Sequence, residues 1–325
     1  MIRRPLGRSG MAIGPLMLGG NVFGWTANRQ ASFAILDKFV DAGLNAIDTA
    51  DIYSSWVPGH VGGESETVIG EWLSQRGGRD RVVIATKVGS APTPEAGPWL
   101  LTADHIIRSV EASLARLQTD YIDLYQAHGD DTNTPLDETL EAFEQLIRTG
   151  KVRAVGTSHF TPERLSVALG LSQEGAQSRF ASLQPRYSLA ARGEYEGELQ
   201  ALCVREEIGV LCYGVLAKGF LTGKFRSEED LAGKVYADFL RPNMNERGQR
   251  IIQVLETIAE EKRTTIPAVA IAWVMAQPGV TAAIAAVDTT EQLDEVLGAV
   301  DLWLSATDIA ALSAASSTAS HADVA

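Results

Sequence analysis

The chain has 325 residues, 45% of them hydrophobic and 21% charged, which is ordinary for a globular protein with a sizeable core. Its formal net charge of -13 argues against nucleic acid or an anionic membrane as a partner, because either requires a basic surface. No apolar run is long enough to span a bilayer and the N-terminus lacks the apolar core of a signal peptide, so we expect a cytoplasmic protein. Cys203 and Cys212 have no metal-type spacing and are expected to be reduced, buried thiols.

The chain opens with a hairpin and continues as strand-then-helix units. Residues 2–13 place the turn sequence GRSG between short apolar pieces, which predicts a hairpin capping one end of the fold. Short apolar runs predict strands at 15–18, 44–47, 82–86, 121–127, 152–157, 181–184, 209–213 and 282–286. Residues 31–41 predict an amphipathic helix, and the alternation with the strands predicts further helices at 63–75, 102–117, 137–148, 161–170, 195–207, 247–262, 267–276 and 290–299. Thr102 and Thr161 are expected to cap two of these helices.

Eight such units without a linker predict one domain over 1–325, a closed (β/α)8 barrel with an N-terminal hairpin cap and a C-terminal helical tail. An open doubly wound sheet fits less well. Gly19 and Gly20 follow the first strand, but the chain has no G-x-G-x-x-G turn with an acidic partner downstream. The tail, 306–325, begins as a short helix, and we expect its Ala- and Ser-rich end to be disordered.

Chemically active side chains follow three successive predicted strands. The stretch LNAIDTADIY supplies Asp48 and Tyr53, RVVIATK ends at Lys87, and YIDLYQAH ends at His128. In a parallel barrel all carboxyl ends of the strands lie on one face, so these side chains are expected to converge there. A phenol with an ordinary pKa of about 10 needs a shift of ~3 units to exchange a proton near neutral pH. We expect the Lys87 ammonium to favour the phenolate of Tyr53 and Asp48 to hold the lysine, which makes a general acid/base for a carbonyl oxygen.

Two other interpretations of these residues remain open at this point. His128, Asp48 and His60 would serve as ligands in a metal-dependent barrel enzyme, but no compact ligand spacing supports that, and we expect no metal. Taken singly, a loop tyrosine, a strand-end lysine and a lone histidine are more often packing, solvated or hydrogen-bonded groups. The joint spacing is what favours catalysis.

At these residues the chain resembles the aldo-keto reductases over nearly its whole length. The matching pieces are LNAIDTADIY with GGESETVIGEWL after it, ATKVG, YIDLYQAH, GKVRAVGTSHF and CYGVLAKGFLTGKF. The resemblance implies that Tyr53 is the general acid/base of an aldehyde or ketone reductase or alcohol dehydrogenase. It also implies that Lys87 and Asp48 tune Tyr53, that His128 orients the carbonyl, and that a nicotinamide cofactor binds without a Rossmann fold.

The resemblance also implies the cofactor contacts. Ser158 and Gln184 match the positions that hold the carboxamide, and Tyr213 matches the aromatic residue that stacks on the nicotinamide; His159 stands where asparagine is frequent. The segment from Leu216 to Lys224 offers backbone amides and two lysines for the pyrophosphate, and Gln292 also matches. The residues given a cofactor role are Ser158, Gln184, Tyr213, Leu216, Lys218, Gly219, Lys224 and Gln292. For Lys224, a solvated loop charge is the alternative.

The sequence departs from the family at the adenosine end. Where the family commonly has Pro-Gly-x-Arg and an asparagine, this chain has Ala285 to Asp288 and then Val296. A lost arginine and a gained carboxylate weaken recognition of a 2′-phosphate, unless Asp288 only caps the helix at 290. The resemblance implies NADP(H) as the cofactor, because the family commonly uses it. NAD(H) is the alternative because of Asp288.

The substrate is expected to be a small carbonyl compound or its alcohol. Phe23, Trp25 and Trp56 are expected to form an aromatic wall over the nicotinamide, or else to pack between loops. A second functional hypothesis is a regulatory or redox-sensing subunit that binds NADP(H) with little turnover, like the aldo-keto-reductase-like partners of ion channels. The sequence carries no signal for an oligomeric state.

Overall fold

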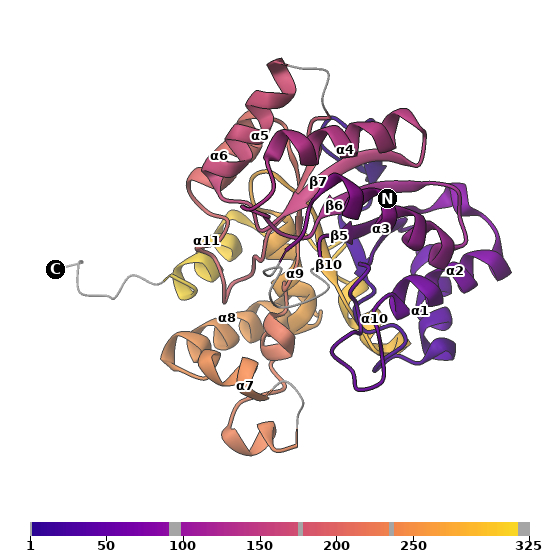
Figure 1. The fold of residues 1–325 in the computed structure, drawn as a ribbon. Coiled ribbons are helices and arrows are strands. Elements are labelled where there is room, and N and C mark those ends of the chain that lie inside the picture. Colours follow the sequence, from indigo (N-terminus) through magenta and orange to yellow (C-terminus); the bar gives the residue numbers. More distant parts are fainter. Residues whose placement is uncertain (1, 91–98, 175–177, 234–236, 318–325) are drawn as a thin grey trace.

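The computed structural model describes residues 2–90, 99–174, 178–233 and 237–317. Its centre is a closed parallel barrel with the strand order β10-β3-β4-β5-β6-β7-β8-β9 (Figure 1). The strands are β3 (Leu16–Gly19), β4 (Ala46–Asp48), β5 (Val83–Val88), β6 (Ile122–Ala127), β7 (Val152–Ser158), β8 (Ser182–Gln184), β9 (Gly209–Cys212) and β10 (Val280–Ala285). The barrel closes because β10 pairs with both β9 and β3. The predicted (β/α)8 class is confirmed.

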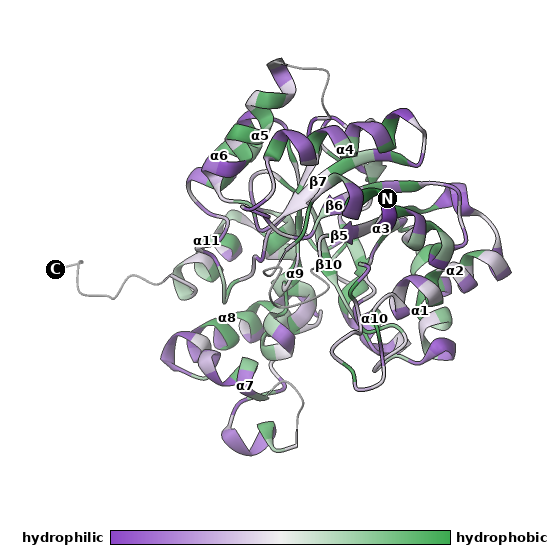
Figure 2. Ribbon diagram, in the orientation of Figure 1, coloured by the Kyte–Doolittle hydropathy of each residue, from purple (hydrophilic) through white to green (hydrophobic). Residues whose placement is uncertain are grey.

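Helices surround the barrel and turn their polar sides outward (Figure 2). They are α1 (Arg29–Asp41), α2 (Glu64–Arg76), α3 (Ala103–Leu117), α4 (Leu136–Arg148), α5 (Pro162–Glu174), α6 (Glu198–Arg205), α8 (Glu246–Lys262), α9 (Ile266–Met275), α10 (Thr290–Leu297) and α11 (Ala306–Ala315). Helix α9 differs from the others because nearly all of its side chains are apolar and buried. It packs against β10 on one side and α8 on another, so it has no solvent-exposed face that would require polar side chains.

The hairpin of β1 (Arg4–Pro5) and β2 (Ala12–Ile13) closes the amino-terminal end of the barrel, as predicted. Leu6 is buried among the small and apolar residues that fill the barrel interior. Gly7 has φ +52°, and a Cβ there would lie 2.1 Å from the Ala181 carbonyl oxygen, so the tight turn requires glycine. With this end closed, the carboxyl ends of the strands form the accessible face.

The segment between β9 and α8 contains short helices that the sequence did not predict: η3 (Ala217–Thr222), η4 (Glu228–Leu231), α7 (Ala237–Leu240) and η5 (Arg241–Asn243). The short helix η1 (Arg79–Arg81) precedes β5. Predicted helices and strands all have counterparts, with ends that differ by a few residues. Helix α11 confirms the helical start of the tail, whereas the expected disorder of its end concerns residues outside the described ranges.

The two predicted caps have different outcomes. Thr161 caps α5, since its Oγ1 accepts a hydrogen bond from the backbone N–H of Arg164. Thr102 occupies the N-cap position of α3 but makes no side-chain cap bond. Instead the Glu138 carboxylate of α4 accepts from the backbone N–H of Ala103 at 3.0 Å. A residue far along the chain has replaced the local cap.

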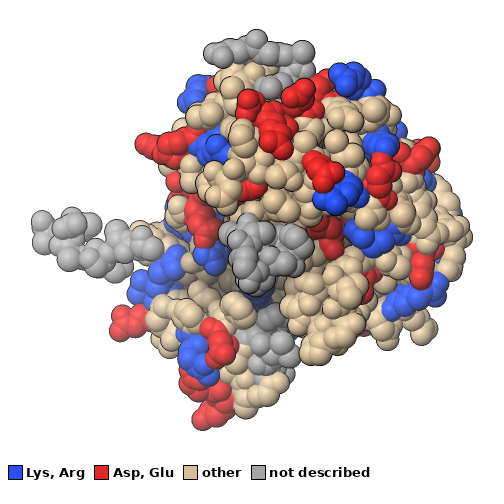
Figure 3. Space-filling view, in the orientation of Figure 1, with Lys and Arg blue, Asp and Glu red and all other residues tan. Residues whose placement is uncertain are grey.

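Charges of both signs are interspersed on the face drawn in Figure 3. No helix in the described ranges is long and apolar enough to cross a membrane. Cys203 and Cys212 are buried and not joined in a disulfide, as predicted.

Candidate active site

Asp48 and Lys87 meet at the carboxyl ends of neighbouring strands. Asp48 ends β4 and pairs in register with Ala85 of β5, so Lys87, two residues further on, points to the same side. The Lys87 Nζ donates to Asp48 Oδ2 at 2.8 Å, to the Thr49 carbonyl at 2.8 Å and to the Tyr53 hydroxyl at 2.7 Å. The lysine side chain is 0% exposed, so a buried cation stands directly beside the phenol.

Tyr53 reaches this pair from the loop after β4. Its hydroxyl donates to Asp48 Oδ2 at 3.1 Å while accepting from Lys87. The other carboxylate oxygen of Asp48 accepts from the Gln184 side-chain amide at 2.8 Å. Asp48 therefore has three protein donors, which explains how a carboxylate that is only 2% exposed is satisfied.

His128 follows β6 and faces the same phenol. Its ring centroid lies 6.0 Å from that of Tyr53, and its Nδ1 is buried without a hydrogen-bond partner among the described residues. Burial lowers the pKa of His128 well below its usual range, and the positive charge of Lys87 adds to this. The imidazole is therefore neutral near pH 7, with one ring nitrogen able to donate and the other able to accept.

The expected lowering of the Tyr53 pKa is wrong for this arrangement. Burial and the Asp48 carboxylate raise the pKa of the phenol well above its ordinary value, and burial lowers the pKa of Lys87 against the opposing pull of Asp48. A neighbouring lysine favours the phenolate, but the loss of water around the buried phenol opposes it. Tyr53 thus holds its proton, which is the form a proton donor needs.

A cavity of about 1750 Å³ opens at this face of the barrel. It exceeds the usual range of about 300–1,000 Å³ for a site that holds one small ligand, so it has room for a dinucleotide together with a substrate. Asp48, Tyr53 and His128 line it, whereas Lys87 lies behind them. Every residue given a cofactor role in the sequence also lines this cavity: Ser158, Gln184, Tyr213, Leu216, Lys218, Gly219, Lys224 and Gln292.

The polar groups near the catalytic end suit a nicotinamide. The Ser158 hydroxyl donates to the backbone carbonyl of Gln184 at 2.7 Å, and the Gln184 side-chain amide donates to Asp48, so a hydroxyl and an amide lie together in the cavity lining. Such a set suits a primary carboxamide, and the Tyr213 ring lines the wall beside it. His159 has φ +56° and its Nε2 lies 3.3 Å from the Tyr213 hydroxyl, so it fixes the ring that is expected to stack.

Left-handed backbone conformations gather at this cavity. Among the described non-glycine residues with positive φ, three follow or end helices, where this is common: Gln118, Glu207 and Arg263. The other four lie at or beside the site: Ser54, His159, Ala217 and Lys218. A side chain in this region costs about 1–3 kcal/mol and persists where the surroundings impose it, which is frequent at functional sites.

The aromatic wall is partly as expected. Trp25 and Trp56 line the cavity with ring centroids 5.6 Å apart, and Trp56 lies 6.1 Å from Tyr53. Phe23 does not line the cavity. It is fully buried in the main hydrophobic core, because the loop after β3 folds over it.

Two residues at the site were not identified from the sequence. The ring of Trp99 lies 5.3 Å from that of His128 and 6.4 Å from that of His159, so it packs over both imidazoles. Arg186 lines the cavity and forms an ion pair with Glu194. The available signals were an aromatic residue, Trp99, shortly before the predicted helix at 102–117, and an arginine two residues after Gln184.

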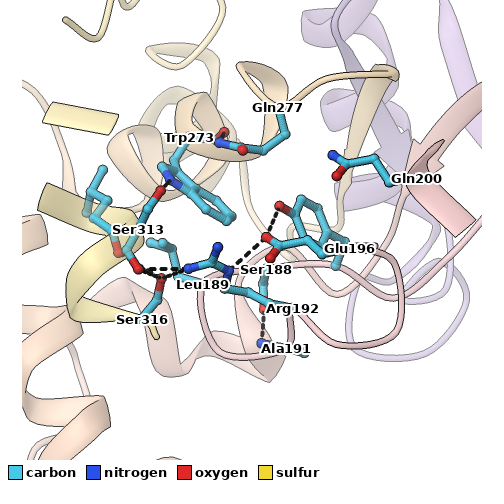
Figure 4. A network of polar contacts seen from close by, with 12 residues as sticks. Ser188, Leu189, Ala191, Arg192, Glu196, Gln200, Trp273, Gln277, Ser313 and Ser316 are labelled. Carbon is cyan, nitrogen blue, oxygen red and sulfur yellow. Dashed lines mark hydrogen bonds and ion pairs between the residues drawn. The ribbon is translucent and has the colours of Figure 1, made fainter. Parts of the chain in front are cut away.

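Arg192 joins the cavity wall to the carboxyl end of α11 (Figure 4). Its guanidinium donates to the Ser313 carbonyl at 2.7 Å and to the Ser316 hydroxyl at 3.1 Å, at the end of α11. On the other side it pairs with Glu196 at 2.7 Å, and the Tyr187 hydroxyl donates to the same carboxylate at 2.6 Å. A cation at the carboxyl end of a helix is favourable, so this contact holds α11 against the site.

The structure does not favour the metal hypothesis. In the described part of the chain no group of three or more His, Cys, Asp or Glu side chains is placed to hold a metal ion, so Asp48, His60 and His128 do not form one. Asp48 is instead taken up by Lys87, Tyr53 and Gln184.

Comparisons with known proteins agree with this geometry. The model of the Aldo/keto reductase family matches residues 15–317. The chain is 37% identical to the uncharacterized oxidoreductase YrpG of Bacillus subtilis, over 92% of this chain and 91% of that protein. It is 30% identical to a probable voltage-gated potassium channel subunit beta of Arabidopsis thaliana, over 91% and 90%. It is 32% identical to norsolorinic acid reductase of Aspergillus flavus, over 93% and 77%. The chain belongs to the aldo/keto reductase family.

Proposed function

We propose that Tyr53 is the general acid/base with which this carbonyl-reducing oxidoreductase converts an aldehyde or ketone to an alcohol, or the reverse. The observation that carries the proposal is the triangle of Tyr53, Lys87 and Asp48, in which one buried ammonium contacts both the phenol oxygen and a carboxylate. A nicotinamide cofactor, which enzymes of this family use, supplies or accepts the hydride when bound. The residues of the chain supply the proton and the positioning.

Each residue has a defined part in the reduction. The neutral Tyr53 hydroxyl donates its proton to the carbonyl oxygen as negative charge develops there. Lys87, held by Asp48 and the Thr49 carbonyl, stabilises the phenolate that remains. His128, neutral and facing Tyr53, donates a hydrogen bond that orients the carbonyl oxygen.

The cofactor and substrate share one cavity. Ser158, Gln184 and Tyr213 would hold the nicotinamide, and Leu216, Lys218, Gly219, Lys224 and Gln292 would hold the rest of the cofactor. Trp25 and Trp56 line the region of the cavity next to Tyr53, and Trp99 packs against His128. This surface favours a partly apolar, planar carbonyl compound. One relative of the chain is named norsolorinic acid reductase.

The test is turnover of the reduced cofactor against a panel of aliphatic, sugar and aromatic aldehydes and ketones. We expect Tyr53→Phe to lower kcat by about 10²- to 10⁴-fold with cofactor affinity kept, because only proton transfer is removed. The matched control is Tyr121→Phe, at a tyrosine that precedes β6 and stacks under two arginines, away from the cavity. Near-normal turnover by Tyr53→Phe would overturn the assignment.

A regulatory subunit that binds the cofactor with little turnover is the second candidate. The similarity to a probable potassium channel subunit beta favours it. The same panel of carbonyl compounds distinguishes the reductase from the regulatory subunit. A regulatory subunit binds the reduced cofactor but shows very little oxidation of it with any of the compounds.

A further inference from the structure

One end of the cavity carries negative charge from β10 and α10. Asp288 follows β10, and Gln292 and Glu295 belong to α10; all three line the cavity. The segment from Tyr213 to Lys224 leads from the catalytic end to this one, because Lys224 contacts Glu295. A dinucleotide with its nicotinamide beside Tyr213 and its pyrophosphate along this segment therefore places its adenosine near Asp288.

Asp288 does not cap α10, contrary to the ordinary role considered for it. Thr289 is the N-cap, and its Oγ1 accepts from the backbone N–H of Gln292. The Asp288 carboxylate instead accepts a hydrogen bond from the Thr26 hydroxyl of the loop after β3. The Gln292 side chain accepts from the Asp288 backbone N–H at 2.8 Å, so the residue is held from two sides. The carboxylate is fixed at the cavity wall and retains further acceptor capacity.

The cations that line the cavity are already engaged. Lys224 Nζ lies 3.1 and 3.3 Å from the two Glu295 oxygens. Arg186 pairs with Glu194, Arg192 with Glu196, and Lys218 lies 5.2 Å from the ring of Phe239. Arg247, the third arginine among the described lining residues, donates to the backbone carbonyls of Ser316, Ala190 and Leu189. A 2′-phosphate, which carries close to two negative charges, would meet a fixed carboxylate there without a bidentate donor.

We propose that this end of the cavity selects NAD(H) over NADP(H), with Asp288 as the discriminating residue. Its carboxylate accepts a hydrogen bond from the adenosine ribose 2′-hydroxyl and repels a phosphate on the same oxygen. The same chemistry, an acidic residue on the ribose hydroxyl, distinguishes the two cofactors in dinucleotide-binding folds of other architecture. The inference rests on the proposed function, since it takes the occupant to be a nicotinamide dinucleotide.

The test is the equilibrium dissociation constant of the full-length protein for NADH and for NADPH, measured separately by quenching of protein fluorescence. We expect NADH to bind tighter by about tenfold or more. Asp288→Asn keeps the shape of the side chain and weakens the repulsion, so it is expected to reduce the ratio of the NADPH to the NADH dissociation constant. Asp288→Arg is expected to reverse that preference. Glu295→Gln is expected to narrow the ratio as well, because it releases Lys224.

The matched control is Glu291→Gln, on the same helix but not among the residues that line the cavity. It removes the same charge and is expected to leave the ratio unchanged. Equal affinities or tighter NADPH binding by the wild type would overturn the inference and leave the proposed function standing. A ratio that favours NADH but is equal in wild type and Asp288→Asn would overturn the role of Asp288. Failure of both cofactors to bind would overturn the proposed function itself.

Discussion

Lys87 is a fully buried cation, and the stability of the folded protein depends on its pairing with Asp48. An ion pair removed from water is satisfied only while both partners and their hydrogen bonds are present. Lys38 and Asp294 form the contrasting pair at the surface, where Asp294 is 62% exposed. We therefore expect Asp48→Asn to lower the free energy of unfolding by about 3–5 kcal/mol and Asp294→Asn by less than about 1. Urea denaturation of the two variants makes the comparison; equal losses would mean that Lys87 does not depend on its partner.

Asp51 is a half-buried residue near Lys87, and the Oδ1 atom of its carboxyl group is buried. Burial raises its pKa to about 7, and the Glu66 carboxylate adds to this while Arg116 and Lys87 oppose it. Its Oδ1 has no hydrogen-bond partner in the described part of the chain, which agrees with a disfavoured charge. Because the pKa is higher in the folded chain than the ordinary value of about 4, the stabilising effect is complete below about pH 4 and is lost as the pH rises through about 7.

The raised pKa of Asp51 predicts that the folded protein becomes less stable as the pH rises through neutrality. Between pH 6 and pH 8 the wild type should lose roughly 1 kcal/mol of unfolding free energy relative to Asp51→Asn, which cannot ionise. Denaturation at both pH values, with Asp120→Asn at an exposed aspartate as the control, measures the difference. Parallel pH profiles of wild type and Asp51→Asn would show that the carboxyl does not titrate in this range.

Helix α11 is held at its carboxyl end by two arginines. Arg192 bonds to Ser313 and Ser316, and Arg247 Nε donates to the Ser316 carbonyl at 2.9 Å. The Trp273 indole adds a hydrogen bond to the Ser313 hydroxyl at 3.1 Å, so α9 is joined to the same turn (Figure 4). The helix thus depends on contacts from other elements, since its own sequence, mostly Ala and Ser, has little apolar surface to bury.

We expect Arg192→Ala to destabilise this contact by about 1–3 kcal/mol, because Glu196, the Ser313 carbonyl and the Ser316 hydroxyl lose their donor. Hydrogen–deuterium exchange should become faster in α11 and remain unchanged in α10. Arg205→Ala is the control, since Arg205 is 64% exposed and pairs only at 3.3 Å with its neighbour Glu206. Unchanged protection in α11 would show that Arg247 and Trp273 suffice.

At the scale of the whole molecule, barrel closure brings the site together. Asp48, Lys87, His128 and Gln184 come from four different strands or strand ends, β4, β5, β6 and β8. The hairpin and Leu6 fill one end of the barrel, and the cavity opens at the other. Residues far apart in sequence therefore become hydrogen-bond partners, such as Gln184 and Asp48, which are 136 positions apart.

The amino-acid sequence by itself determined the alternation of strands and helices, the eightfold count and the set of side chains at the strand ends. These follow from local periodicity and from the rule that the carboxyl ends of a parallel barrel share one face. The convergence of Asp48, Tyr53, Lys87 and His128 at one end of the barrel was predictable for that reason.

Only the tertiary structure decided the features that depend on burial and on distant partners. It raised rather than lowered the Tyr53 pKa, because desolvation and the Asp48 carboxylate both disfavour the phenolate. It placed Phe23 in the core, gave the α3 cap to Glu138 and tied Asp288 to Thr26. Each outcome depends on which groups are desolvated and which residues come into contact across the barrel. The spacing of residues along the chain encodes neither the desolvation nor these contacts.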